Sequence, residues 1–314
     1  MTTTPASSHD QQTDATPAWV PVAAVAVTLI LWASAFVAIR HLGHDFSPGA
    51  LTLGRLAVGA LCLAVVALAR GVQRPTRTDL AGIVAIGVLW FGVYNVSLNE
   101  GERHVDAGTA SMLLQTSPLL IAVMAGLFLR ERFTGWLFVG LVVAFGGVTL
   151  IAMSTSPGGD RDTLGVALCL LCALVYSISM IVQKPLVSRL PAVQVTWLAA
   201  TVGLLVCLPF VGNLVTETRA APTSSILWVV YLGVFPTALA FTTWAYALRH
   251  MDASRLGITT YLVPPITIVM GLVFLGEAPP SLAYAGGVLA LAGVALARRT
   301  PRRTTTAPEA TPAS

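Results

Sequence analysis

The chain has 314 residues, 55% of them hydrophobic and only 10% charged, and its formal net charge is +4 at pH 7. Soluble domains carry about 25% charged residues, so this composition excludes an ordinary soluble protein. The basic residues form no patch on one segment, so the positive charge does not indicate nucleic-acid binding.

Taken in chain order, ten apolar runs approach the roughly 20 residues that a helix needs to cross a bilayer. The first five runs are Val20–Ile39, Gly49–Leu68, Leu80–Leu98, Ala107–Leu129 and Thr134–Met153. The second five are Leu164–Val182, Val193–Val211, Ile226–Leu248, Leu256–Leu275 and Leu282–Ala297. They lack the polar outer face that a surface helix of a soluble bundle carries. We therefore expect an all-α membrane protein with ten transmembrane helices.

The ends of the chain, residues 1–17 and 300–314, are rich in Thr, Ala, Pro and Ser and are expected to be disordered tails. The first tail carries Asp10 and Asp14 but no Lys or Arg, so the first run lacks the positive flank of a signal peptide and is kept as a helix. With the N-terminus in the cytoplasm, thirteen of the eighteen Lys and Arg residues fall on the cytoplasmic side and four outside. Because basic residues concentrate in cytoplasmic loops, we expect both termini in the cytoplasm and the protein in the cell membrane.

An internal repeat divides the chain. A shift of 146 positions aligns residues of the same type over two consecutive predicted helices and their flanks. The aligned pairs include Arg103 with Arg249, His104 with His250, Asp106 with Asp252, Pro118 with Pro264, Glu131 with Glu277 and Gly147 with Gly293. We expect two five-helix repeats, at 18–153 and 164–299, joined by a linker at 154–163. Because five is odd, the second repeat enters the membrane from the opposite side, which gives the inverted architecture of many transporters.

Four segments carry motifs in a recognisable order. They are Trp32-Ala33-Ser34-Ala35-Phe36, Arg55, the run from Ser117-Pro118 to Arg130-Glu131, and the run from Tyr261-Leu262-Val263-Pro264 to Gly276-Glu277. From Val20 to Arg298 the chain resembles the ten-helix proteins with two EamA-type domains in the drug/metabolite transporter superfamily, although Arg130 stands where members usually have Gly. The resemblance implies a carrier that exports a small metabolite or drug, for example an amino acid, by alternating access. Uptake or exchange of a similar solute is the alternative.

Polar side chains within membrane spans are costly and mark candidate sites. Arg55 is the one ionised side chain well inside a predicted helix. It could bind an anionic group of a solute, or its long side chain could reach outward to the membrane surface. Asn95, near the end of the third run, could line a cavity with Arg55 or could hydrogen-bond helices together. Both alternatives stay open for each residue.

Gln115 and Tyr261 occupy equivalent positions of the repeat, and each precedes a proline by three residues, Pro118 and Pro264. A proline removes a helical hydrogen bond and opens the helix near the preceding turn. Symmetry-related interruptions near the membrane centre are typical of a transporter binding site. We therefore predict that Gln115 and Tyr261 face one central cavity; the alternative is a kink that serves packing alone.

Aromatic residues supply the remaining candidates for the walls of this cavity. Trp32 and Phe36 lie in the first predicted helix with Ser34 between them, and Tyr176 lies in the sixth. Aromatic residues at helical spacing also serve packing or the membrane interface, which is the alternative for these positions. Trp32 is the strongest candidate, because it lies well inside its run and belongs to the motif that carries the resemblance.

Several kinds of chemistry lack their residues in this sequence. No Walker motif is present, and the predicted spans hold no His, so we expect neither ATP hydrolysis, a metal site nor any other cofactor. Every Asp, Glu and His falls in a loop, a tail or a helix end, so we expect transport that follows the solute gradient without proton coupling. An intramembrane enzyme would need clustered carboxylates or His, and a membrane scaffold would need an effector domain. The expected partners are a small-molecule substrate and membrane lipid, with no nucleic acid; monomer and homodimer stay open.

Overall fold

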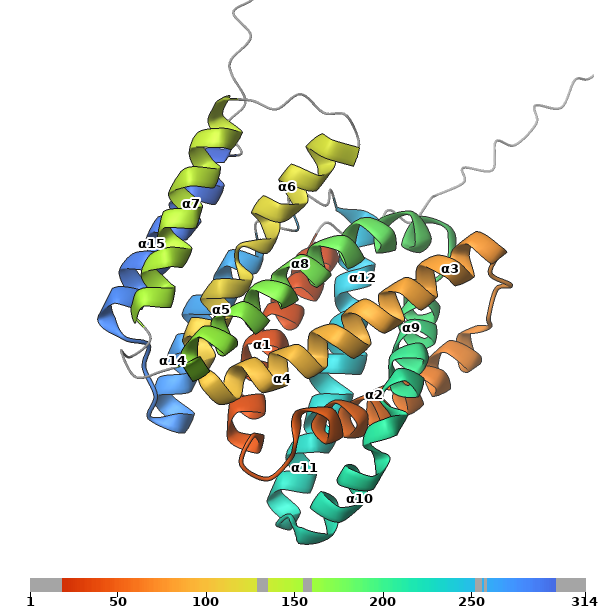
Figure 1. Cartoon of the computed structure of the whole chain (residues 1–314). Coiled ribbons are helices and arrows are strands. Elements are labelled where there is room, and N and C mark those ends of the chain that lie inside the picture. Colours follow the sequence, from red (N-terminus) through yellow and green to blue (C-terminus); the bar gives the residue numbers. More distant parts are fainter. Residues whose placement is uncertain (1–18, 129–134, 155–159, 252–255, 257–258, 298–314) are drawn as a thin grey trace, which may run out of the picture.

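The computed structural model describes residues 19–128, 135–154, 160–251, 256 and 259–297, and these residues form helices without a strand (Figure 1). The helices of the first part are α1 (Trp19–Leu42), α2 (Pro48–Arg70), α3 (Arg77–Ile86), η1 (Gly87–Tyr94), α4 (Asn95–His104), α5 (Ala107–Leu114), α6 (Ser117–Phe128) and α7 (Gly135–Ser154). Those of the second part are α8 (Asp160–Arg189), α9 (Ala192–Val206), η2 (Leu208–Phe210), α10 (Val211–Ala220), α11 (Thr223–Leu232), η3 (Gly233–Leu239), α12 (Ala240–His250), η4 (Thr260–Leu262), α14 (Val263–Leu275) and α15 (Ser281–Ala297). The all-α class is confirmed over this part of the chain. The predicted tails at 1–17 and 300–314, and the motif residues Arg130 and Glu131, lie outside it.

Five of the described helices are long and apolar enough to cross a membrane. They are Trp19–Leu42, Pro48–Arg70, Arg77–His104, Thr163–Arg189 and Thr223–His250. A sixth span results if the pair Ala192–Val206 and Leu208–Ala220, bent by 54°, is counted as one. Shorter apolar helices cover Phe138–Ile151, Thr260–Leu275 and Ser281–Gly293. The chain is therefore a multi-pass membrane protein by length and composition of its helices, while the number ten stays a prediction.

Two of the long helices contain a π-helical segment in the middle, η1 and η3. A π-helical turn leaves carbonyl groups without their usual backbone donors, and in this protein side chains donate hydrogen bonds to them instead. Asn95 Nδ2 donates to the carbonyl oxygens of Trp90 and Phe91 at 2.9 and 3.1 Å, and Thr237 Oγ1 donates to that of Leu232 at 2.8 Å. Both π segments are thus stabilised by a polar side chain that points into the bundle.

The two parts of the chain pack into one bundle. Helix α1 packs against α12 and α14, α2 against α9 and η3, and α4 against α8. Without a hydrophobic driving force between helices in lipid, such contacts depend on close packing, often at small residues. Gly59, for example, lies so close to η3 that an added Cβ would sit 2.8 Å from Thr237 Cγ2.

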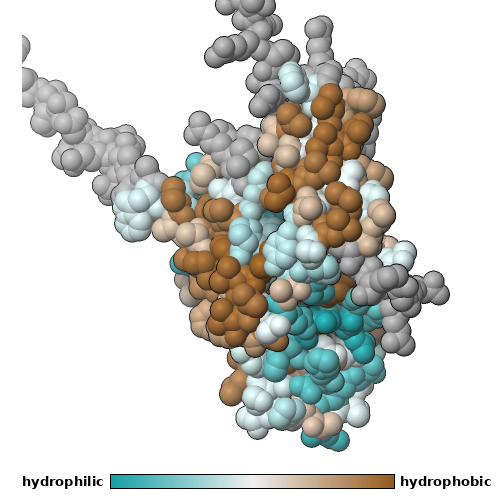
Figure 2. All heavy atoms as spheres, turned by 90° about the vertical axis from the view of Figure 1, so that its left-hand side faces the viewer, coloured by the Kyte–Doolittle hydropathy of each residue, from teal (hydrophilic) through white to brown (hydrophobic). Residues whose placement is uncertain are grey.

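Helices α7 and α15 lie side by side at the left of Figure 1 and form the most extensive helix pair. An added Cβ on Gly286 would sit 2.6 Å from the carbonyl oxygen of Gly147, and one on Gly147 would sit 2.5 Å from that of Gly286. The outer faces carry large apolar side chains, among them Phe138 (69% exposed) and Phe145 (72% exposed). Figure 2 shows this side of the molecule largely covered by hydrophobic residues, with hydrophilic residues gathered lower down. Such an apolar surface suits contact with lipid rather than with water.

Candidate functional site

A small cavity of about 70 Å³ lies at the centre of the bundle. Residues from α1, α2, η1, α4, α5, α6, α8, α12, η4 and α14 line it: Trp32, Ala35, Phe36, Ile39, Arg55, Trp90, Tyr94, Asn95, Leu98, Ser111, Leu114, Gln115, Ser117, Tyr176, Phe241, Thr260 and Val263. Six of the eight predicted site residues are among them: Trp32, Phe36, Arg55, Asn95, Gln115 and Tyr176. A cavity of this size holds a few water molecules, so a larger solute requires the lining residues to move apart.

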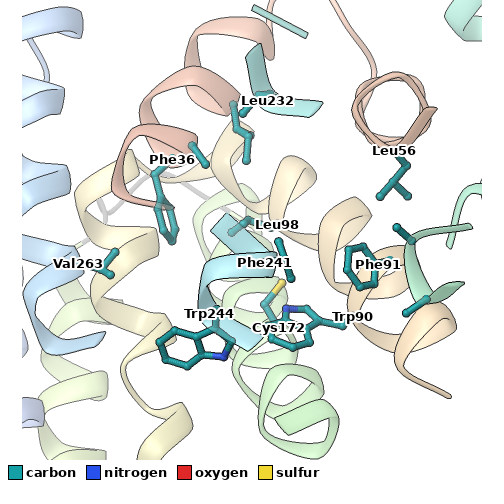
Figure 3. Close-up of a cluster of buried hydrophobic side chains, with 14 of the residues drawn as sticks. Phe36, Leu56, Trp90, Phe91, Leu98, Cys172, Leu232, Phe241, Trp244 and Val263 are labelled. Atoms are coloured by element: carbon teal, nitrogen blue, oxygen red, sulfur yellow. The ribbon is translucent and has the colours of Figure 1, made fainter. Parts of the chain in front are cut away.

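One wall of the cavity is aromatic. The ring of Trp32 lies 5.5 Å from Phe241, 6.4 Å from Trp90 and 6.5 Å from Tyr176, measured between ring centroids. The ring centroid of Trp244 lies 4.8 Å from that of Trp32, and Trp244 Nε1 donates to Met180 Sδ at 3.4 Å. These rings come from α1, η1, α8 and α12, so contacts of about 0.5–1.5 kcal/mol per pair join both parts of the chain. Figure 3 shows Trp90, Phe241 and Trp244 close together in this cluster.

Trp32 also brings a polar group to this wall. Its Nε1 is buried and has no hydrogen-bond partner among the described residues. A buried donor without a partner costs about 1–3 kcal/mol, so such groups are rare unless a ligand or water supplies the acceptor. Trp32 therefore carries a buried donor without an acceptor in the wall of the cavity.

Arg55 is only 4% exposed, so its guanidinium lies in the interior of the bundle. Its Nε and Nη2 both donate to Thr237 Oγ1, at 3.1 Å each. None of the ion pairs found within the described ranges includes Arg55. A buried cation whose hydrogen bonds go only to a hydroxyl keeps the capacity to bind an anion.

Asn95 and Asn99 lie on the same face of α4 and differ in their contacts. Asn95 lines the cavity, while its amide nitrogen is held by the carbonyl groups of η1. Asn99 Nδ2 donates to the carbonyl oxygen of Pro48 at 3.1 Å and to Thr52 Oγ1 at 2.9 Å, both on α2. Asn99 thus joins helices, whereas Asn95 combines a structural contact with a place on the cavity wall.

The two predicted helix interruptions meet at this cavity. Between α5 and α6 the helix is interrupted at Gln115 and Thr116, and η4 precedes α14 in the second part of the chain. Gln115 Nε2 donates to the carbonyl oxygen of Thr260 at 2.5 Å, and Thr260 Oγ1 donates to Gln115 Oε1 at 3.3 Å. Tyr261 is not a lining residue; its neighbours Thr260 and Val263 are. The 3₁₀ turn places Thr260, not Tyr261, opposite Gln115.

Pro118 and Pro264 each follow a lining residue. Ser117 and Val263 line the cavity, and the prolines occupy the first turn of α6 and α14. Proline is accepted there because the first turn of a helix has no partner for its backbone N–H groups. Each proline therefore marks the start of a helix that begins beside the cavity.

Ser34 lies on another side of α1. Its Oγ donates to the carbonyl oxygen of Leu31 at 2.8 Å and lies 2.6 Å from Tyr231 Oη. It lines a wider, mostly apolar depression of about 520 Å³ between α1, α11 and α14, with His41 and Trp228 near one end. Ser34 therefore does not line the central cavity.

Glu102 is a residue that the sequence analysis missed. The predicted third span ends at Leu98, but the helix continues to His104 and packs against α8 and α5, which leaves Glu102 only 1% exposed. Glu102 thus lies at a helix end, as expected, but its side chain is buried, which the sequence analysis did not foresee. The spacing of Asn95, Asn99 and Glu102 could have revealed it, because positions i, i+4 and i+7 share one helix face.

The EamA-like transporter family matches the chain twice, at residues 19–153 and 163–299. A protein of Streptantibioticus cattleyicolor named "Probable terminal-alkyne amino-acid exporter" is 37% identical over 276 residues, covering 88% of this chain and 92% of that protein. The "Uncharacterized transporter YdfC" of Bacillus subtilis is 33% identical over 269 residues, covering 84% and 86%. A solved crystal structure is similar in fold, with a TM-score of 0.60 at 21% identity, covering 88% of this chain and 96% of that one.

The two family matches cover nearly all of the described bundle, each from its first helix to its last. The resemblance that the motifs indicated is thereby confirmed. The chain belongs to the EamA-like transporter family and is a multi-pass membrane transporter.

Proposed function

We propose that this protein exports a small amino acid with an apolar side chain across the cell membrane by alternating access. The observation that carries the proposal is the buried guanidinium of Arg55 beside an aromatic wall in one central cavity, with no ion pair to it among the described residues. The carboxylate of the solute binds Arg55 and the free N–H of Trp32, and its apolar side chain packs against the aromatic rings. The relative named "Probable terminal-alkyne amino-acid exporter" supports this substrate class.

The proposal includes ten helices in two inverted five-helix repeats, with both termini in the cytoplasm. The π segments support it, since they begin at Gly87 and Gly233, which the shift of 146 positions relates. The interruptions at Gln115 and at η4 are related by the same shift. So are Gly147 and Gly293, which both lie in the contact between α7 and α15. Equivalent interruptions from both repeats at one cavity suit a carrier that opens to either side in turn.

Transport is tested with purified protein in liposomes loaded with unlabelled propargylglycine, the simplest terminal-alkyne amino acid. The protein should accelerate entry of labelled propargylglycine by exchange, and norvaline, of similar shape without the alkyne, should compete. Arg55→Lys should retain part of this activity, because it keeps a cation, whereas Arg55→Leu should abolish it with the protein still folded. Equal activity in all three versions would reject Arg55 as the carboxylate site.

Direction is tested in cells. Cells that express the protein should lose preloaded propargylglycine faster than cells that express Arg55→Leu. Faster accumulation from the medium, with no faster loss, would assign uptake instead. No exchange of either amino acid in liposomes would exclude the proposed substrate class while leaving the family assignment intact.

A further inference from the structure

At one end of the bundle Arg40 joins three elements. Its Nε donates to both carboxylate oxygens of Glu277 at 3.2 and 3.1 Å, and its Nη1 donates to the carbonyl oxygen of Glu102 at 2.6 Å. Arg40 lies in α1, Glu102 in α4 and Glu277 after α14, so these contacts connect the two family matches. Ile39, next to Arg40 in α1, and Leu98, one helical turn before Glu102 in α4, line the central cavity. Arg40, Glu102 and Glu277, here called the end cluster, thus lie at one end of the cavity.

Glu102 is buried within the end cluster, and neither of its carboxyl oxygens has a hydrogen-bond partner in the described part of the chain. Asp79, the other carboxylate that is buried among the described residues, differs: it accepts hydrogen bonds from Thr76 and pairs with Arg189. An ionised carboxylate without hydrogen bonds is very costly to bury, whereas the neutral acid is much less so. The buried form of Glu102 is therefore best described as the acid that carries its proton.

The surrounding charges lead to the same conclusion. Four charged side chains lie near enough to act on Glu102: Arg40, Arg55, Asp106 and Glu277. The neutral titratable groups in reach are Tyr94, Cys169 and Cys172. Two cations face two anions when Glu102 carries a proton, and a third anion remains uncompensated when it does not. Closure of this end is thus electrically balanced only with the proton bound.

We propose that Glu102 is a proton-binding site whose occupancy is linked to the opening of the cavity at the end cluster. With a proton on one carboxyl oxygen, Glu102 stays buried and Arg40 remains bound to Glu277. When the proton leaves to water, the carboxylate needs solvation, and this favours separation of α1, α4 and the segment after α14. In this step the O–H bond of the acid breaks and an O–H bond to the accepting water molecule forms. The proposal goes beyond solute transport and does not depend on which solute is carried.

The proton itself is tested without any solute, by infrared difference spectra of the reconstituted protein between acidic and alkaline pH. The wild type should show the C=O band of a protonated carboxylic acid, part of which is missing in Glu102→Gln. Glu100→Gln is the matched control, because Glu100 lies on the same helix but is partly exposed and bound to His104 and Arg103. It should keep that part of the band. An unchanged band in Glu102→Gln would overturn the proposal.

Opening is tested with Ile39→Cys in a background without the four native cysteines, labelled by a membrane-impermeant thiol reagent from each side. Each rate is divided by that of the denatured protein, because thiols react faster at high pH. Labelling from the side of the end cluster should rise several-fold with pH in the wild-type and Glu102→Asp backgrounds. It should stay slow at every pH with Glu102→Gln, which mimics the protonated acid.

A wild-type response to pH in the Glu102→Gln background would overturn the link between proton and opening. The Glu102→Asp protein guards against mere misfolding, since it keeps a titratable carboxyl at the same place. Failure of propargylglycine exchange would reject the proposed substrate without affecting either measurement.

Discussion

Two side chains that line the cavity, Arg55 and Trp32, each bury a polar group that helix packing does not require. Arg55 is a buried cation without a carboxylate partner in the described part of the chain, and Trp32 has a buried N–H without an acceptor there. Each is unfavourable without a further partner, and the anionic solute that we propose would supply one to both.

Trp32→Phe tests this at the scale of one hydrogen bond. The substitution keeps an aromatic ring in the wall but removes the N–H group, so the KM for propargylglycine exchange should rise roughly tenfold, or about 1.5 kcal/mol, the contribution of a hydrogen bond to a charged group. Trp19→Phe, on the exposed first turn of the same helix, should leave KM unchanged. An unaltered KM in Trp32→Phe would show that the N–H does not bind the solute.

The helices that line the cavity differ from the pair α7 and α15, which packs away from it. The interrupted helices and η1 line the cavity, and η3 contacts its lining residue Arg55 through Thr237. Helices α7 and α15 instead form an uninterrupted pair through glycines, with apolar outer faces. We infer that this pair supports the bundle against lipid and takes no part in binding.

Two glycine substitutions on this pair have opposite expected results. Gly286→Val would bring a Cβ to 2.6 Å from the carbonyl oxygen of Gly147 and should lower the free energy of unfolding by about 1–3 kcal/mol. Gly146→Val is the matched control, because its nearest neighbour, Leu289 Cδ2, would be 3.8 Å away. Unfolding by denaturant in mixed micelles measures both. Equal stability of the two variants would contradict the close α7–α15 contact.

For the whole molecule, the number of membrane spans decides whether the two halves are inverted. Five or six spans follow from helix length alone, and ten follow from the apolar runs. The difference lies in the shorter helices α5, α6, α7, α14 and α15, two of them joined at an interruption. Interrupted helices beside a cavity can still cross a membrane, because protein rather than lipid surrounds the free backbone groups.

Reporter fusions distinguish the two counts. With ten spans a reporter fused after Phe128 should lie in the cytoplasm, and one fused after Gly276 should lie outside. With six spans both results reverse, because α5–α6, α7 and α14 would not cross. A reporter after Thr76 should be cytoplasmic in either case and serves as the internal control.

The sequence alone determined the properties that depend on local composition and order. Apolar runs specify helices that enter a membrane, prolines mark where helices are interrupted, and the motif order of Trp32, Arg55 and the two proline runs indicates the family. Six of the eight predicted site residues line one cavity. Polar side chains inside an apolar run are costly to expose to lipid, so they face the interior of the bundle.

Only the tertiary structure decided which face of each helix meets the cavity. It turned Ser34 toward Tyr231, brought Thr260 rather than Tyr261 to Gln115, and buried Glu102 beyond the predicted end of its span. These outcomes depend on helix rotation, on a single 3₁₀ turn and on the packing of a polar helix end against its neighbours. The orientation of Ser34 and the choice between Thr260 and Tyr261 leave the composition of each apolar run unchanged. The pattern of apolar and polar residues therefore does not predict these two outcomes.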